Sequence, residues 1–177
     1  VDIGPFEQQA AQTFVVTTLN DELDSTNPNA TLADEDGGSG LSLREALFLA
    51  NEDPTTADTI TFDPSLAGGT LTLTMGQLGV TGNVTINGDI YGNGTPGIAI
   101  DGNNTSRVFD IDDGNAATSV TATLNGLTIQ DARANGYREG SYGGGIYVGT
   151  DDALTLSNSA VTGNYATAEG AGLYAAA

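Results

Sequence analysis

The sequence contains no cysteine, histidine, tryptophan or lysine. Without cysteine or histidine the chain has no disulfide, no thiol nucleophile, no Ser-His-Asp triad and none of the usual ligand sets for zinc, haem or iron–sulfur clusters. The chain has four arginines and 23 acidic residues, which gives a formal net charge of -19. Phosphate backbones and anionic lipid surfaces repel such a chain, so we expect no nucleic-acid or membrane partner. The chemistry that remains is that of carboxylates.

Long apolar runs are also missing. No segment approaches the roughly 18 consecutive apolar residues that a membrane span requires. The first residues, Val1 to Glu7, have neither the basic nor the long apolar region of a signal peptide. A length of 177 residues suits one domain, and 25 glycines favour short strands joined by many turns.

One segment has a strong helical pattern. Ser42 can cap a helix, with Glu45 three residues later to complete a capping box. Leu43 and the three apolar residues that follow it at helical spacing form one face, and Asn51 and then Pro54 provide the end. We expect this helix to cover the end of the core. An acidic loop, residues 20–40, precedes it.

The rest of the chain favours short strands, with Asx-Gly turns between several of them. The expected strands are residues 13–19, 59–62, 70–74, 84–86, 98–100, 108–111, 120–127, 146–148 and 154–156. Asx-Gly pairs are also typical of hairpins, so an antiparallel sandwich is the alternative.

A repeat decides between these two architectures. The segment of Gly143 to Tyr147 recurs as Glu169 to Tyr174, and Gly145 and Gly172 lie 27 residues apart, within the range of stacked repeats. Equivalent strands would then stack, with Asn ladders at the turns and glycine at the corners. The predicted fold class is therefore all-β, a parallel β-helix (β-solenoid) with a short N-terminal capping helix.

Residues 41–47, Leu-Ser-Leu-Arg-Glu-Ala-Leu, resemble the bacterial cap module named for Cys-Ser-Leu-Arg-Glu-Ala, with Leu41 in place of the cysteine. Similarity continues through residues 57–63, 84–88, 127–129 and 143–147. The resemblance implies a right-handed β-helix of the pectate-lyase-like type, in secreted or surface-attached, adhesin-like proteins. It does not by itself supply a function.

We expect three regions along the chain. Residues 1–12 resemble the closing segment of a preceding β-helix unit, residues 13–56 form the cap region, and residues 57–177 form the coils, as one unit of a longer repeat protein or fibre. The function that follows is a structural or adhesive module at the cell surface or outside the cell, assembling head to tail with copies of itself or with flanking repeats. The predicted assembly residues are Val1, Ile3, Phe6, Leu173 and Tyr174, with residues 1–12 donated to the open end of a neighbour.

Carboxylates suggest one cofactor, calcium. The acidic loop offers Asp21, Asp24, Asp34 and Asp36 as oxygen ligands, although it matches no EF-hand and a merely solvated loop is the alternative. We predict no catalytic residue, because the cluster of Asp110, Asp112 and Asp113 near Arg107 is better explained by turn caps or a solvated face. The alternative function is a carbohydrate-active, polysaccharide lyase-like enzyme or a carbohydrate-binding module.

Tyrosines gather in the C-terminal half of the chain, and such rings can stack on sugars. Tyr147 and Tyr174 occupy equivalent positions of the repeat, however. We therefore expect these two rings to stack on each other as a ladder.

Overall fold

The computed structural model describes residues 10–27, 31–35, 37–136 and 141–177. Its elements, in chain order, are β1 (Thr13–Val16), α1 (Leu32–Glu35), α2 (Leu43–Asn51), β2 (Asp58–Phe62), the 3₁₀ turn η1 (Pro64–Leu66), β3 (Thr70–Thr72), β4 (Leu78–Val80), β5 (Val84–Asn87), β6 (Ile98–Asp101), β7 (Phe109–Ile111), β8 (Thr121–Asn125), β9 (Leu127–Gln130), β10 (Arg133–Ala134), β11 (Ile146–Val148), β12 (Ala153–Ser157), β13 (Ala160–Thr162), β14 (Tyr165–Ala166) and β15 (Leu173–Ala175). Among these described residues, no helix is long and apolar enough to cross a membrane.

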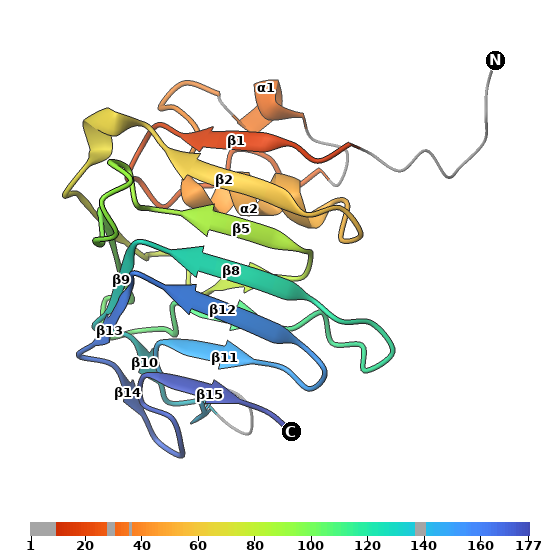
Figure 1. Ribbon diagram of the computed structural model, residues 1–177, viewed down its shortest axis with the longest axis vertical. Coiled ribbons are helices and arrows are strands. Elements are labelled where there is room, and N and C mark those ends of the chain that lie inside the picture. Colours follow the sequence, from red (N-terminus) through yellow and green to blue (C-terminus); the bar gives the residue numbers. More distant parts are fainter. Residues whose placement is uncertain (1–9, 28–30, 36, 137–140) are drawn as a thin grey trace.

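The strands form four sheets, and all pairings between the described strands are parallel. The largest has the order β1-β2-β5-β8-β12, and its strands follow one another along the long axis of the molecule (Figure 1). Two four-stranded sheets have the orders β15-β11-β7-β4 and β13-β9-β6-β3, and β10 pairs with β14. Consecutive strands mostly enter different sheets, so each strand pairs with a segment far away in the sequence.

The predicted fold class is wrong. Four separate parallel sheets together with helices, at about 11% helix and 33% strand, make the chain α/β-like, and the described residues show no closed solenoid. The glycine repeat does predict pairing correctly, since Ile146 next to Gly145 is in register with Leu173 next to Gly172. A repeat spacing specifies which segments lie side by side, but it does not require that the turns join the sheets into one continuous wall. That is why the β-helix and solenoid assignments fail.

Alternation along the strands builds the core. In β5 and β9 the inward side chains, such as Ile86 and Ile129, are completely buried, whereas their neighbours Thr85 and Thr128 are partly exposed. This period of two places Leu, Ile, Val and Phe inside and Thr, Asn and Asp outside. Parallel strands are joined only by long connections. Burial of the inward side chains therefore stabilises contacts between segments that are far apart in the sequence.

Asparagine side chains reinforce the largest sheet where its strands end. Asn125 Nδ2 donates to Asn87 Oδ1 at 2.8 Å, and Asn158 Nδ2 donates to Asn125 Oδ1 at 2.9 Å. The predicted ladder of asparagines is confirmed. Asn125 both donates and accepts, so the row of hydrogen bonds continues across three successive levels of the sheet.

Helix α2 has the predicted ends and the predicted place. Glu45 N donates to Ser42 Oγ at 3.1 Å and Ser42 N donates to Glu45 Oε2 at 2.7 Å, which completes the capping box. The apolar face, with Leu43 and Leu47 buried, packs against β1, β2 and β4. This helix lies at the β1 end of the molecule (Figure 1).

The capping box leads to the first prediction, Ser42→Ala. The change removes the cap acceptor and also the 2.8 Å hydrogen bond that Ser42 Oγ donates to Glu22 O. We expect the free energy of unfolding to fall by about 1–2 kcal/mol, measured by urea denaturation followed by circular dichroism. Ser39→Ala, at an exposed serine of the same loop, should change it by less than about 0.5 kcal/mol. An equal loss of unfolding free energy in the two variants would contradict the stabilising role of the Ser42 cap.

Candidate functional site

The first strands and the last strands of the sheets differ in how far other residues cover their edges. This difference defines the candidate site. At the β1 end, side chains of α2 and of the acidic loop satisfy backbone groups in and around β4. Asn51 Nδ2 donates to Gly79 O at 3.0 Å, and Arg44 donates to Gly76 O at 2.7 Å and to Gln77 O at 3.1 Å. Asp21 accepts from two backbone N–H groups just before β4. An exposed strand edge is a template for further pairing, and here that edge is covered.

The opposite end consists of β12, β13, β14 and β15, each the last strand of its sheet. These strands contain no charged residue. Positions that are core elsewhere are open to solvent, since Leu156 is 37% exposed while its register partner Leu124 is 0% exposed. Leu173 is 40% exposed, whereas its partner Ile146 is fully buried. We call these four strands the open edge.

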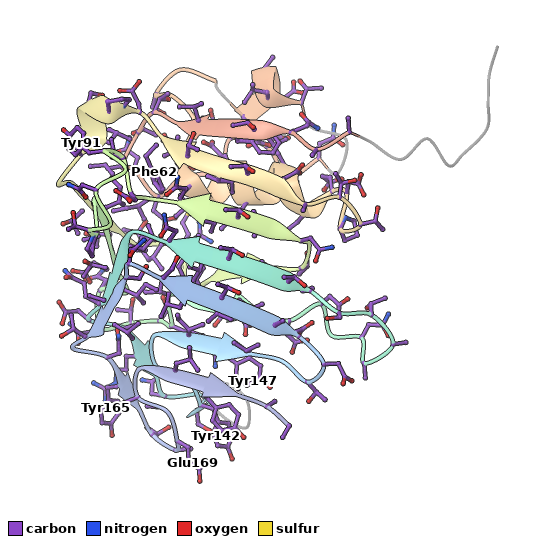
Figure 2. All side chains as sticks on the ribbon, in the orientation of Figure 1. Phe62, Tyr91, Tyr142, Tyr147, Tyr165 and Glu169 are labelled. Atoms are coloured by element: carbon purple, nitrogen blue, oxygen red, sulfur yellow. The ribbon has the colours of Figure 1, made fainter. Side chains whose placement is uncertain are left out.

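Aromatic rings lie at this end of the molecule, where Figure 2 labels Tyr142, Tyr147 and Tyr165. Tyr147 and Tyr174 stack with ring centroids 5.9 Å apart and planes 14° apart, which confirms the predicted ladder. Tyr142 packs against Tyr174 at 4.7 Å, and the Arg107 guanidinium lies 4.9 Å from the centre of the Tyr147 ring. The rings therefore pack on one another and on arginine, which rigidifies the base of β15.

Arg107, just before the interior strand β7, connects to the segment that carries Tyr142. It is buried, and it donates to Gly143 O at 3.0 Å and to Tyr142 O at 2.7 Å. It also forms a 2.9 Å ion pair with Asp110. Burial raises the pKa of Asp110 even though Arg107 acts in the opposite direction.

The other acids near Arg107 serve local turns. Asp112 Oδ1 accepts from Gly114 N at 2.7 Å, and Asp113 accepts from Asn115 N and from the Thr118 hydroxyl. The hydrogen bond from Thr118 lowers the pKa of Asp113. These contacts are those of turn caps, which is the explanation that the sequence favours for this cluster.

The residues predicted to bind calcium do not come together as a group. Asp21 forms a 2.6 Å ion pair with Arg44, and although burial opposes it, hydrogen bonds from Arg44 and two backbone amides lower the pKa of Asp21. Asp34 accepts from Thr31 N and Thr31 Oγ1 at 2.7 Å, beside α1. Asp24 lies in the same loop, and Asp36 is outside the described residues. Within the described part of the chain, no group of three or more carboxylates could hold a metal ion.

The predicted assembly residues are placed in part. Leu173 and Tyr174 lie on β15, at the open edge, whereas Val1, Ile3 and Phe6 are outside the described residues. Leu156 on β12 and Tyr165 on β14, which are 37% and 50% exposed, are not among the residues predicted from the sequence for assembly. A signal was present for Leu156, because residues 153–157 echo 121–125, with which they pair in register, and no described segment pairs with the other side of β12.

Comparison with known proteins adds no relative. No protein-family model, no curated protein and no solved structure matches the chain. The resemblance of residues 41–47 to the Cys-Ser-Leu-Arg-Glu-Ala cap, and the division of the chain at residues 12 and 56, therefore stay predictions.

The attachment of β15 leads to the second prediction, Gly144→Ala. Gly144 N donates to Gly170 O at 3.0 Å, and a Cβ on Gly144 would overlap the carbonyl oxygens of Ala171 and Tyr165. Backbone on both sides is fixed by hydrogen bonds, so we expect a loss of about 2 kcal/mol or more in the free energy of unfolding. Gly79→Ala is the matched control, since nothing lies within 4 Å of its added Cβ. Urea denaturation measures both, and a Gly144→Ala protein as stable as the control would contradict the assigned contact.

Proposed function

We propose that this chain is a structural module that assembles head to tail with further copies of itself through the open edge. One observation supports this above all: the last strand of every sheet is free of charge, and apolar side chains at core positions are exposed there. Soluble proteins protect such edges with charged residues, proline or a covering element. A chain with 23 acidic residues has ample charge for that purpose, yet none lies on these strands.

The partner that fits the open edge is the β1 end of another copy. β1 and β12 are the first and last strands of one parallel sheet, so β1 of a second copy placed beside β12 would continue the same ladder. Gln12 O and Val16 O accept from the β2 side, which leaves the backbone groups of Thr13 and Val15 directed away from β2. The two ends differ in structure, so the contact is heterologous and can repeat without closing.

Charge sets the conditions under which this assembly forms. A net charge of -19 makes separate copies repel each other over about a Debye length, roughly 10 Å at 0.1 M salt. The contact strands are uncharged, so salt weakens the repulsion without weakening the contact. The secreted or surface location, which the resemblance implies, belongs to the same proposal: a module that extends a fibre or a repeat array outside the cell.

Third, two substitutions on the open edge, Leu156→Lys and Leu173→Lys, test the proposal. The wild-type protein should form a concentration-dependent series of oligomers in sedimentation velocity, and elongated particles by electron microscopy. Each variant should sediment as a monomer, because a lysine there places an unpaired charge in the contact. Thr121→Lys, at an exposed position of the interior strand β8, is the control and should assemble like the wild type. A wild-type protein that stays monomeric at every concentration and salt level would refute the proposal.

The direction of assembly is tested by mixing. Val15→Pro removes a backbone N–H that points away from β2, which an edge strand tolerates. Val15→Pro and Leu156→Lys should each be monomeric alone and should form a 1:1 dimer together, because each retains one intact end. If Val15→Pro assembles like the wild type, the open edges meet each other and the head-to-tail arrangement is wrong.

A further inference from the structure

Two of the four arginines in the chain, Arg107 and Arg133, line one pocket beside strand β10. They are the only charged residues in its lining within the described part of the chain. The other polar residues of the lining are Gln77, Thr105, Ser106 and Asn135. The chain has 23 acidic residues, and because no described one lines this pocket, the pocket is a local positive region on an acidic protein.

Backbone hydrogen bonds hold the two sides of this pocket in place. β10 pairs with β14 along one edge, and at its other edge Arg133 N donates to Ser106 O at 2.9 Å. Ser106 lies in a tight turn, in which Thr105 N and Ser106 N donate to Gly102 O at 3.0 and 3.2 Å. The backbone from which the Arg133 and Ser106 side chains extend is therefore fixed, and a ligand that binds them does not have to order it.

Arg133 supplies a positive charge that no described residue balances. Arg107 Nη1 lies 2.9 Å from Asp110 Oδ1, so these two charges compensate each other. Arg133 forms no ion pair with any residue that the structure describes, and its guanidinium lies 5.0 Å from the centre of the Tyr165 ring. A guanidinium held over an aromatic ring keeps N–H groups at its edge that can bind a carboxylate. The pocket thus has the charge to balance one negative charge.

Ser106 supplies a hydroxyl group without a partner. Its Oγ is buried and has no hydrogen-bond partner among the described residues, which is unfavourable unless a bound molecule provides one. The amide of Asn135, at an exposed position of the same pocket, also makes no hydrogen bond with the described part of the chain. Both groups can donate and accept, whereas a carboxylate only accepts. A ligand that satisfies both therefore carries a hydroxyl group as well as a carboxylate.

We propose that this pocket binds a small hydroxy acid, with its carboxylate on Arg133 and its hydroxyl group on Ser106 and Asn135. The pocket has a volume of about 220 Å³, below the roughly 300–1,000 Å³ of sites for drug-sized ligands, which favours a small acid. A doubly charged anion such as sulfate fits less well. It exceeds the one balancing charge, and the net charge of -19 repels it more strongly than a monoanion.

This binding site goes beyond the proposed assembly. Its ligand groups lie on and just after β10 and in the turn before β7, and of the residues that define it only Tyr165 belongs to the open edge. Binding of the acid is therefore measured on single chains, so that failure of the assembly and failure of the binding site are separate results.

The fourth prediction is hydroxy-acid binding to the monomeric Leu156→Lys protein, measured by isothermal titration and by amide chemical shifts in NMR spectra; if the wild type is itself monomeric, it takes the place of that background. Glycolate should bind once per chain and shift the amide signals of residues 105–107 and 133–136. Acetate, which lacks the hydroxyl group, should bind about three- to tenfold more weakly, and glycerol, which lacks the carboxylate, should not bind. Sulfate should bind more weakly than glycolate. Absence of these shifts with glycolate, or an affinity for acetate or sulfate equal to that for glycolate, would overturn the proposal.

Substitutions in the same background assign the two groups. Arg133→Gln removes the charge and should weaken glycolate binding at least about tenfold. Ser106→Ala should weaken it about three- to tenfold without lowering the Tm, because the hydroxyl group makes no hydrogen bond in the free protein. Ser119→Ala, at an exposed serine in the loop before β8, is the matched control and should bind glycolate like its parent. Unchanged affinity in Arg133→Gln, or equal losses in Ser119→Ala and Ser106→Ala, would contradict the assigned site.

Discussion

Parallel backbone pairing between distant segments is the interaction on which the rest of this structure depends. A parallel pair cannot be closed by a tight turn, so the chain passes through helices or through strands of other sheets before it supplies the partner of each strand. Thr13 pairs with Thr59, and Val84 pairs with Ala122. The segments that connect two such partners must bend sharply and must also bury their own apolar side chains in the core. Glycines permit these sharp bends, and the Asn ladder provides hydrogen bonds where the strands end.

The same dependence explains why the ends of the sheets matter more than their middle. An interior strand such as β8 has partners on both sides, and its inward residues are fully buried. At the other end, the edge of β4 is protected by α2, whose Asn51 and Arg44 take over the role of a missing neighbour there. The last strands have equivalent sequences but no equivalent cover among the described residues. The exposure of Leu156 and Leu173 therefore reflects position in the stack and not a change in the character of the residues.

Local features were predictable from the sequence, and the way in which sheets combine was not. The helix from Ser42 to Asn51 follows from a capping box and an apolar stripe, both of which act within one or two turns. The pairing of Ile146 with Leu173 follows from the glycine repeat. The fold class was wrong because closure depends on the direction of each bend, which residue spacing does not encode. The ion pair of Arg44 with Asp21 was equally hidden, because the two residues lie 23 positions apart in the sequence and the acidic loop between them has no periodic pattern.

The distribution of charge distinguishes two regions of the chain from the rest. Acidic residues at turns keep a chain of short strands soluble, and many of them also accept backbone N–H groups there, as Asp89 and Asp101 do. Glu35 and Glu45 break this pattern, since they are buried and none of the ion pairs of the described arginines reaches them. The open edge breaks it in the opposite sense, because its strands carry no charge and have no cover among the described residues. A second copy placed beside β12 therefore meets an uncharged edge surrounded by acidic turns, and screening of those turns by salt is what we expect to permit the contact.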